Sequence, residues 1–146
     1  MKKAVIYYSK TGNTEGIAKQ LSETHGFDLL PIQAASDDPS QLTVELTQVP
    51  SIKDYQHIVF AGPVHAFSIS KIMKSYLEQL DTFSDQIVDL YITHHFPFAW
   101  LGGNRTLKQM KRLVESKQGI VRKMTSVNWS SKKRQSVIDE LINSYK

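Results

Sequence analysis

Apolar residues gather in five short runs that are rich in β-branched and aromatic side chains, and such runs predict buried strands. Between the runs, apolar residues recur three or four positions apart, which is the spacing of a helix with one buried face. The predicted strands are residues 3–8, 27–32, 57–61, 87–93 and 120–124. The third run is closed by Gly62 and Pro63, two residues typical of a turn.

Four helices are predicted between and after these strands. Gly26 is a typical C-terminal stop for the first helix, and Ser70 a typical cap for the second. The third helix ends before Gly119, and Ser130 or Ser131 caps the last one. The apolar faces consist of Ile17, Ala18, Leu21 and His25; Ile72, Met73, Tyr76, Leu77 and Leu80; Leu107, Met110, Leu113 and Val114; and Val137, Ile138, Leu141, Ile142 and Tyr145.

Strands that alternate with helices predict an α/β fold, a doubly wound five-stranded parallel sheet covered on both faces, in one domain over residues 1–146. The near-continuous apolar strands agree with burial on both faces. A crossover helix is expected between residues 34 and 56. Turn residues leave room only for a short helix over residues 40–47. The β-branched residues in this stretch disfavour a helix.

Composition narrows the chemistry. The chain has 146 residues and no cysteine, which excludes thiolate nucleophiles, redox CxxC motifs and cysteine-ligated metals. His94 and His95 are adjacent and have no evident third ligand, so no metal site is expected. No apolar run approaches the roughly 18 residues of a membrane span, and the N-terminal apolar run is too short for a signal sequence. We expect a cytoplasmic protein.

Positive charge is concentrated in the last third of the chain. Residues 105–146 hold 11 of the 18 Lys and Arg but only 3 of the 14 Asp and Glu. Such asymmetry occurs in nucleic-acid binding proteins. The basic residues are scattered among apolar positions, however, which favours solvated helix faces over a nucleic-acid site.

The first loop, Ser9-Lys10-Thr11-Gly12-Asn13-Thr14, carries the strongest chemical signal. It lies between a strand and a helix, where a doubly wound sheet binds anions on free backbone N–H groups. Its hydroxyls add donors, and Gly12 and Asn13 tolerate tight turns. The loop lacks the spacing of a P-loop or a dinucleotide-binding loop, so it suits one phosphate monoester. Thr14 also fits a simple helix cap.

The first loop resembles the phosphate loop of the flavodoxin-like family, [ST]-x-T-G-x-T. Gly62-Pro63-Val64-His65-Ala66 is similar to the family's second flavin loop, and residues 93–104, which contain Leu101-Gly102-Gly103, are similar to the third. The resemblance spans nearly the whole chain. It implies the strand order 2-1-3-4-5 and bound flavin mononucleotide (FMN).

By this resemblance the FMN phosphate lies on the first loop and the ring between residues 63–68 and 93–103. His65 and Phe67 are stacking candidates on one side, with Phe96, Phe98 and Trp100 on the other; for His65, a polar loop residue is an equal alternative. The assigned residues are Ser9, Lys10, Thr11, Gly12, Asn13, Thr14, Pro63, Val64, His65, Ala66, Phe67, Thr93, His94, His95, Phe96, Trp100, Gly102 and Gly103.

The resemblance implies a redox protein that transfers electrons between protein partners. Two alternatives stay open: an FMN-dependent oxidoreductase that uses NAD(P)H and a quinone, and a flavin-free binding module on the same fold. A carrier is favoured over an enzyme because the chain has no separate pyridine-nucleotide domain. The net charge of +4 departs from the acidic character typical of electron-shuttling flavodoxins, which leaves the partner class open.

Overall fold

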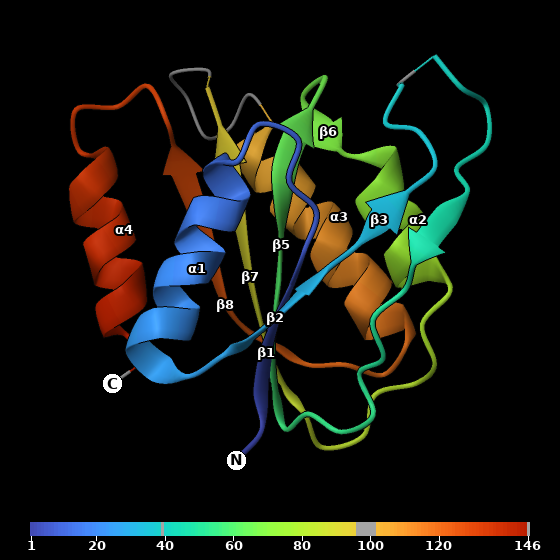
Figure 1. Cartoon of the computed structure of the whole chain (residues 1–146), viewed down its shortest axis with the longest axis horizontal. Coiled ribbons are helices and arrows are strands. Elements are labelled where there is room, and N and C mark those ends of the chain that lie inside the picture. The colour runs from blue at the N-terminus through green and yellow to red at the C-terminus, as the bar shows by residue number, and fades with distance from the viewer. Residues whose placement is uncertain (39, 96–101, 146) are drawn as a thin grey trace.

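A parallel sheet forms the centre of the protein (Figure 1). The computed structural model describes residues 1–38, 40–95 and 102–145. Five strands pair in parallel in the order β2-β1-β5-β7-β8, which confirms the predicted order 2-1-3-4-5. They are β1 (Lys3–Tyr7), β2 (Asp28–Pro31), β5 (His57–His65), β7 (Ile87–His94) and β8 (Val121–Asn128).

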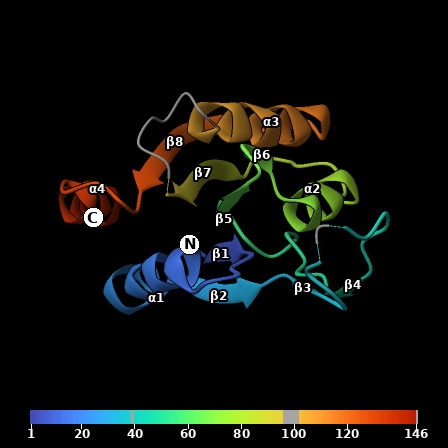
Figure 2. The ribbon, with the colours of Figure 1, turned by 90° about the horizontal axis from the view of Figure 1, so that it is seen from above.

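Helices cover both faces of this sheet (Figure 2). Helices α1 (Asn13–His25) and α4 (Arg134–Asn143) pack on one face, and α2 (Lys71–Glu78) and α3 (Gly103–Ser116) on the other. Successive residues of a strand point to opposite faces, so Val5 packs with α1 and α4 while Ile6 packs with α2 and α3. Burial on both faces explains why the strands are continuous apolar runs.

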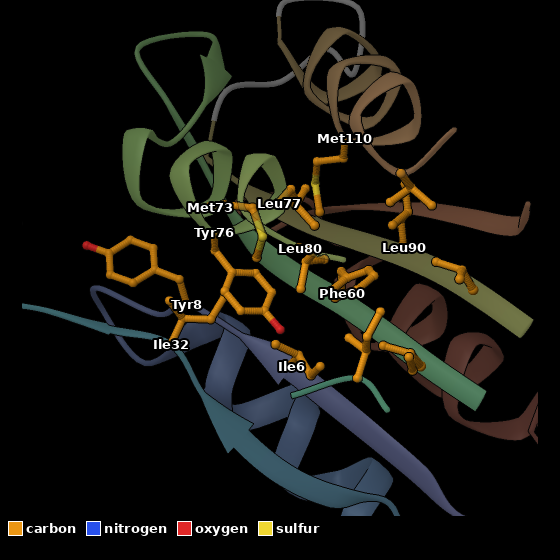
Figure 3. Packing of buried hydrophobic residues seen from close by; sticks show 14 of the residues in the cluster. Ile6, Tyr8, Ile32, Phe60, Met73, Tyr76, Leu77, Leu80, Leu90 and Met110 are labelled. Carbon is orange, nitrogen blue, oxygen red and sulfur yellow. The ribbon is translucent and has the colours of Figure 1, made fainter. Parts of the chain in front are cut away.

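The larger cluster of buried side chains lies between the sheet and α2 and α3 (Figure 3). The ring of Phe60 lies 6.2 Å from that of Tyr76, and both are fully buried. Tyr76 donates to the Pro50 carbonyl at 2.6 Å, so its buried hydroxyl has a partner. As predicted, the Ser70 hydroxyl caps α2 by accepting from the backbone N–H of Met73 at 3.2 Å.

The helix predicted over residues 40–47 is wrong. Strands β3 (Gln33–Ala34) and β4 (Leu46–Gln48) form a separate antiparallel pair, and β4 begins inside the region predicted to be helical. Asp38 accepts hydrogen bonds from the backbone N–H and the hydroxyl of Ser40, at 2.9 and 2.8 Å, and this local turn competes with helix. Thr43 and Val44 add the β-branched character that disfavours helix.

Three predicted boundaries are also corrected. The third strand does not end at Ala61 but continues to His65 and turns back as β6 (Ser68–Ile69), and the fifth continues from Met124 to Asn128. Helix α4 begins at Arg134 rather than directly after a capping serine, and the Ser131 hydroxyl instead accepts from the Lys133 N–H at 3.0 Å. In the described part of the chain, no helix has the length and hydrophobicity needed to cross a membrane.

Candidate functional site

The three loops that the resemblance assigns to a flavin lie at the carboxyl ends of β1, β5 and β7, which are neighbours in the sheet. Parallel neighbours end at the same edge, so these loops begin side by side at the carboxyl edge of the sheet (Figure 1). Doubly wound sheets bind their ligands at this edge.

The first loop is shaped by Gly12, whose φ of 93° is left-handed. This conformation directs the chain into α1, which begins at Asn13. The Ser9 hydroxyl accepts from the backbone N–H groups of Gly12 and Glu15, at 3.1 and 3.3 Å. Asn13 and Thr14 lie between these two residues at the start of the helix, so their N–H groups have no intrahelical acceptor.

Side chains of the first loop reach the end of β7. The Thr14 hydroxyl is buried and lies 2.9 Å from that of Thr93, so the interpretation of Thr14 as a helix cap is wrong. Tyr91 donates to the Thr14 carbonyl at 2.8 Å, and burial holds the pKa of this tyrosine well above its usual range, so it remains a donor. Asn13 Nδ2 lies 3.3 Å from His95 Nε2. The first and third loops are therefore in contact.

These features fit a phosphate group. A helix N-terminus with free N–H groups attracts an anion, and the side chains of Lys10 and Thr11 are exposed beside it. A Cβ at Gly12 would meet nothing within 4 Å, so the backbone there is open to a ligand. Glu15, the acidic residue in the first turn of α1, is paired with Lys19 at 3.2 Å.

The second loop is a tight hairpin. Pro63 lies opposite Thr93 in the sheet, Val64 packs into the core, and His65 pairs with Ser68. The two residues at its tip, Ala66 and Phe67, have left-handed φ values of 49° and 63°. Side chains disfavour this conformation, so the hairpin carries local strain. It exposes 53% of Phe67 at the carboxyl edge.

The third loop is described in part. Phe96, Phe98 and Trp100 lie outside the described residues. His94 is buried, and its carbonyl accepts from the Trp129 N–H at 2.6 Å. Gly102 caps α3, and a Cβ at Gly103 would lie 2.7 Å from the Ser126 hydroxyl oxygen. Gly103 therefore permits a close approach between the end of this loop and β8.

Two hydroxyls near the third loop escaped the sequence analysis. Thr106 Oγ1, in the first turn of α3, and Ser126 Oγ, in β8, are buried and have no hydrogen-bond partner among the described residues. Buried polar atoms are nearly always paired. Both lie close to Gly103, so they are available to a group bound beside this loop. The sequence offers no signal for them, because isolated Ser and Thr are common in surface positions.

A second polar cluster lies at the opposite, amino edge of the sheet and was also missed. The buried carboxylate of Asp89 accepts from His57 Nε2 at 2.7 Å, from Arg122 Nη2 at 2.8 Å and from the Tyr145 hydroxyl at 2.9 Å. Burial alone would raise the pKa of Asp89, but these hydrogen bonds hold it well below its usual range. The cluster joins β5, β7 and β8 to the C-terminal segment.

Comparisons with known proteins agree with the topology. No protein-family model matches the chain, and no curated protein is significantly similar in sequence. Among solved structures, a Bacteroides uniformis protein to which a flavoprotein role is ascribed has a TM-score of 0.69 at 22% identity, covering 96% of this chain and 97% of its own. A Streptococcus pneumoniae flavodoxin has a TM-score of 0.67 at 13% identity, covering 99% and 97%.

A Fusobacterium nucleatum flavodoxin bound to flavin mononucleotide has a TM-score of 0.64 at 15% identity, covering 99% of this chain and 96% of its own. At such low identities the likeness concerns the fold. The chain has the flavodoxin-like fold.

Proposed function

We propose that this protein binds FMN at the carboxyl edge of its sheet and transfers electrons between redox partners. The proposal rests on the first loop, where a left-handed Gly12 and the free N–H groups at the start of α1 form an anion site. The shared fold supports it, because one protein of this fold is bound to flavin mononucleotide.

Each loop has a distinct role in this proposal. The N–H groups of Asn13 and Thr14 and the hydroxyl of Thr11 bind the phosphate. The hairpin at residues 63–67 and the third loop flank the ring, and Thr106 and Ser126 supply hydroxyls near the latter. When bound, FMN supplies one- or two-electron redox chemistry, and the protein sets its orientation and polarity.

The visible absorption spectrum of the purified protein, with and without added FMN, tests the proposal directly. We expect a flavin spectrum and quenched flavin fluorescence on titration. Thr11→Ala should weaken FMN binding roughly tenfold, because a hydrogen bond to a charged group is lost. Thr43→Ala, an exposed threonine on a different loop, is the matched control. Absence of FMN binding would contradict the proposal and favour a flavin-free module. Unchanged FMN affinity in Thr11→Ala would contradict the assignment of the phosphate to the first loop.

A second assay separates a carrier from an oxidoreductase. The FMN-loaded protein is mixed with NAD(P)H and a quinone under air, and oxidation of the nicotinamide is followed. A carrier shows little turnover without a reductase. Robust turnover by the protein alone would refute the carrier and establish an FMN-dependent NAD(P)H:quinone oxidoreductase.

A further inference from the structure

A cleft of about 550 Å³ lies between the β5–β6 hairpin and helices α2 and α3. The short strand β6 lies beside both helices at the carboxyl edge (Figure 2). The apolar side chains of Ala66, Ile69 and Leu113 form part of the walls of the cleft. This volume is within the range of roughly 300–1,000 Å³ that is typical of small-molecule sites. None of residues 9–14 lines it, so it is distinct from the proposed phosphate site.

Gln109 is fixed in this cleft by the hairpin. Its Oε1 accepts from the Ser68 hydroxyl at 3.0 Å and from the backbone N–H of Ile69 at 2.9 Å. A backbone N–H can only donate, so these bonds determine which end of the amide faces the hairpin. Its Nε2 group has no hydrogen-bond partner in the part of the chain that the structure describes, so two N–H donors remain for a ligand. The amide is oriented before any ligand arrives.

Positive charge surrounds this amide. Arg112 lies one helical turn after Gln109 on α3, and Lys74 lines the cleft from α2; both are exposed. Lys71 lies at the edge, where its ammonium donates to the Gln41 carbonyl at 3.0 Å. No aspartate or glutamate is among the described residues that line the cleft. Its charged groups are therefore all positive, which suits a negatively charged ligand.

A second hollow, of about 420 Å³, adjoins the cleft along α3. The two share Gln109 and Arg112, and the second adds Arg105 and Lys108. No acidic residue is among the described residues that line this hollow either. The positive potential thus extends along the helix and favours approach of an anion from that side.

We propose that the cleft binds a small organic anion, with its carboxylate or phosphate group at Gln109, Arg112 and Lys74 and its apolar body against Ala66, Ile69 and Leu113. Charge-assisted hydrogen bonds from Arg and Lys are the strongest that such a group can accept. The cleft includes His65 and Ala66, which the proposed flavin ring also approaches, so a ligand here lies next to that ring.

The test uses the full chain, labelled with ¹⁵N, without flavin. Naphthalene-2-carboxylate, 2-naphthyl phosphate and the neutral naphthalene-2-methanol are titrated while backbone amide signals are followed by NMR. We expect both anions to shift the signals of Ser68, Ile69, Gln109 and Arg112, and the neutral alcohol to bind roughly tenfold more weakly. The ratio of the two anion affinities identifies carboxylate or phosphate as the preferred group.

Arg112→Gln and Lys74→Gln should each weaken anion binding roughly three- to tenfold, a modest effect because both side chains are exposed. Lys132→Gln removes the same charge from an exposed position before α4 and should leave the affinity unchanged. Thermal melts verify that all variants are folded.

Three results would overturn the proposal: equal binding of the alcohol and the acid, full affinity in Arg112→Gln, or signals that shift only outside the cleft. Tighter binding of a polyglutamate peptide to the same residues would also overturn it, by assigning the cleft to an acidic protein. Because this titration uses the protein without flavin, a failure to bind FMN would not change its result. A failure of the anions to bind would likewise leave the FMN test unaffected.

Discussion

Replacement of Asp89 by asparagine should destabilise the protein severely. Asp89 is 1% exposed. In addition to its bonds from His57, Tyr145 and Arg122 Nη2, its Oδ1 accepts from Arg122 Nε at 3.2 Å and from the Lys123 backbone N–H at 3.0 Å. Asparagine has no charge, and its amide nitrogen would face donors. Several buried donors would therefore lose their acceptor.

The magnitude follows from burial. Removal of one partner of a buried ion pair costs about 3–5 kcal/mol. The Arg122 side chain is 48% exposed, so water can solvate its released charge, whereas the His57 side chain is only 8% exposed. We therefore expect a loss at the lower end of this range, about 3 kcal/mol. That is a large part of the free energy of unfolding of a typical protein, about 5–15 kcal/mol. Urea unfolding followed by circular dichroism measures it.

The pH dependence provides a second readout. The pKa of Asp89 is lowered in the folded state. Its contribution to the free energy of unfolding is therefore complete above the pKa of an unfolded aspartate, about 3.9, and is lost progressively as the pH falls below that value. The wild-type protein should lose stability between about pH 4 and 2 more steeply than Asp89→Asn.

Asp85→Asn is the matched control, because Asp85 is exposed just before the same strand. It should change the free energy of unfolding by less than about 0.5 kcal/mol. A loss below about 1 kcal/mol in Asp89→Asn, or identical acid profiles, would refute the reasoning.

Three further changes test the loops and helix ends. Ser9→Ala removes the hydroxyl that accepts from the N–H groups of Gly12 and Glu15 and should lower the free energy of unfolding in urea by about 1 kcal/mol; no loss would contradict this role of the hydroxyl. Ala66→Asn suits the left-handed backbone at this position and should stabilise the protein by about 1 kcal/mol, raising its melting temperature; a lowered melting temperature would contradict the strain inferred there. Arg105→Glu should stabilise α3 by about 0.3–1 kcal/mol, because a negative charge near a helix N-terminus is favourable; destabilisation would contradict this.

The strands of the sheet could be predicted from the sequence because both of its faces are buried. In β1, for example, residues Ala4 to Tyr7 form a continuous apolar run, which is easily recognised in the sequence. The extension of β5 past Ala61 could not be predicted, since Gly62 and Pro63 are typical of a turn. The structure explains it: β1 ends at Tyr7, opposite Ala61, so from there β5 is an edge strand on that side, where proline is tolerated.

The proposed anion site and the Asp89 cluster also differ in how far they can be predicted from the sequence. Residues of the first loop are consecutive, so their hydroxyls and Gly12 form a pattern within six positions. The Asp89 cluster draws on His57, Arg122 and Tyr145, which come from separate elements. Only the pairing of β5 with β7 and of β7 with β8 brings them together.

The beginning of α3 places positive side chains where the helix itself disfavours them. Its free N–H groups give this end a partial positive charge. Arg105 and Lys108 nevertheless lie in the first two turns, and the described helix has no acidic residue in its first turn. A solvated surface needs no such arrangement, because acidic residues would be equally soluble there and would stabilise the helix. The same side chains line the hollow that adjoins the cleft. Residues that oppose local stability are expected where they serve binding, so this placement favours an external anion as the reason for the basic character of α3.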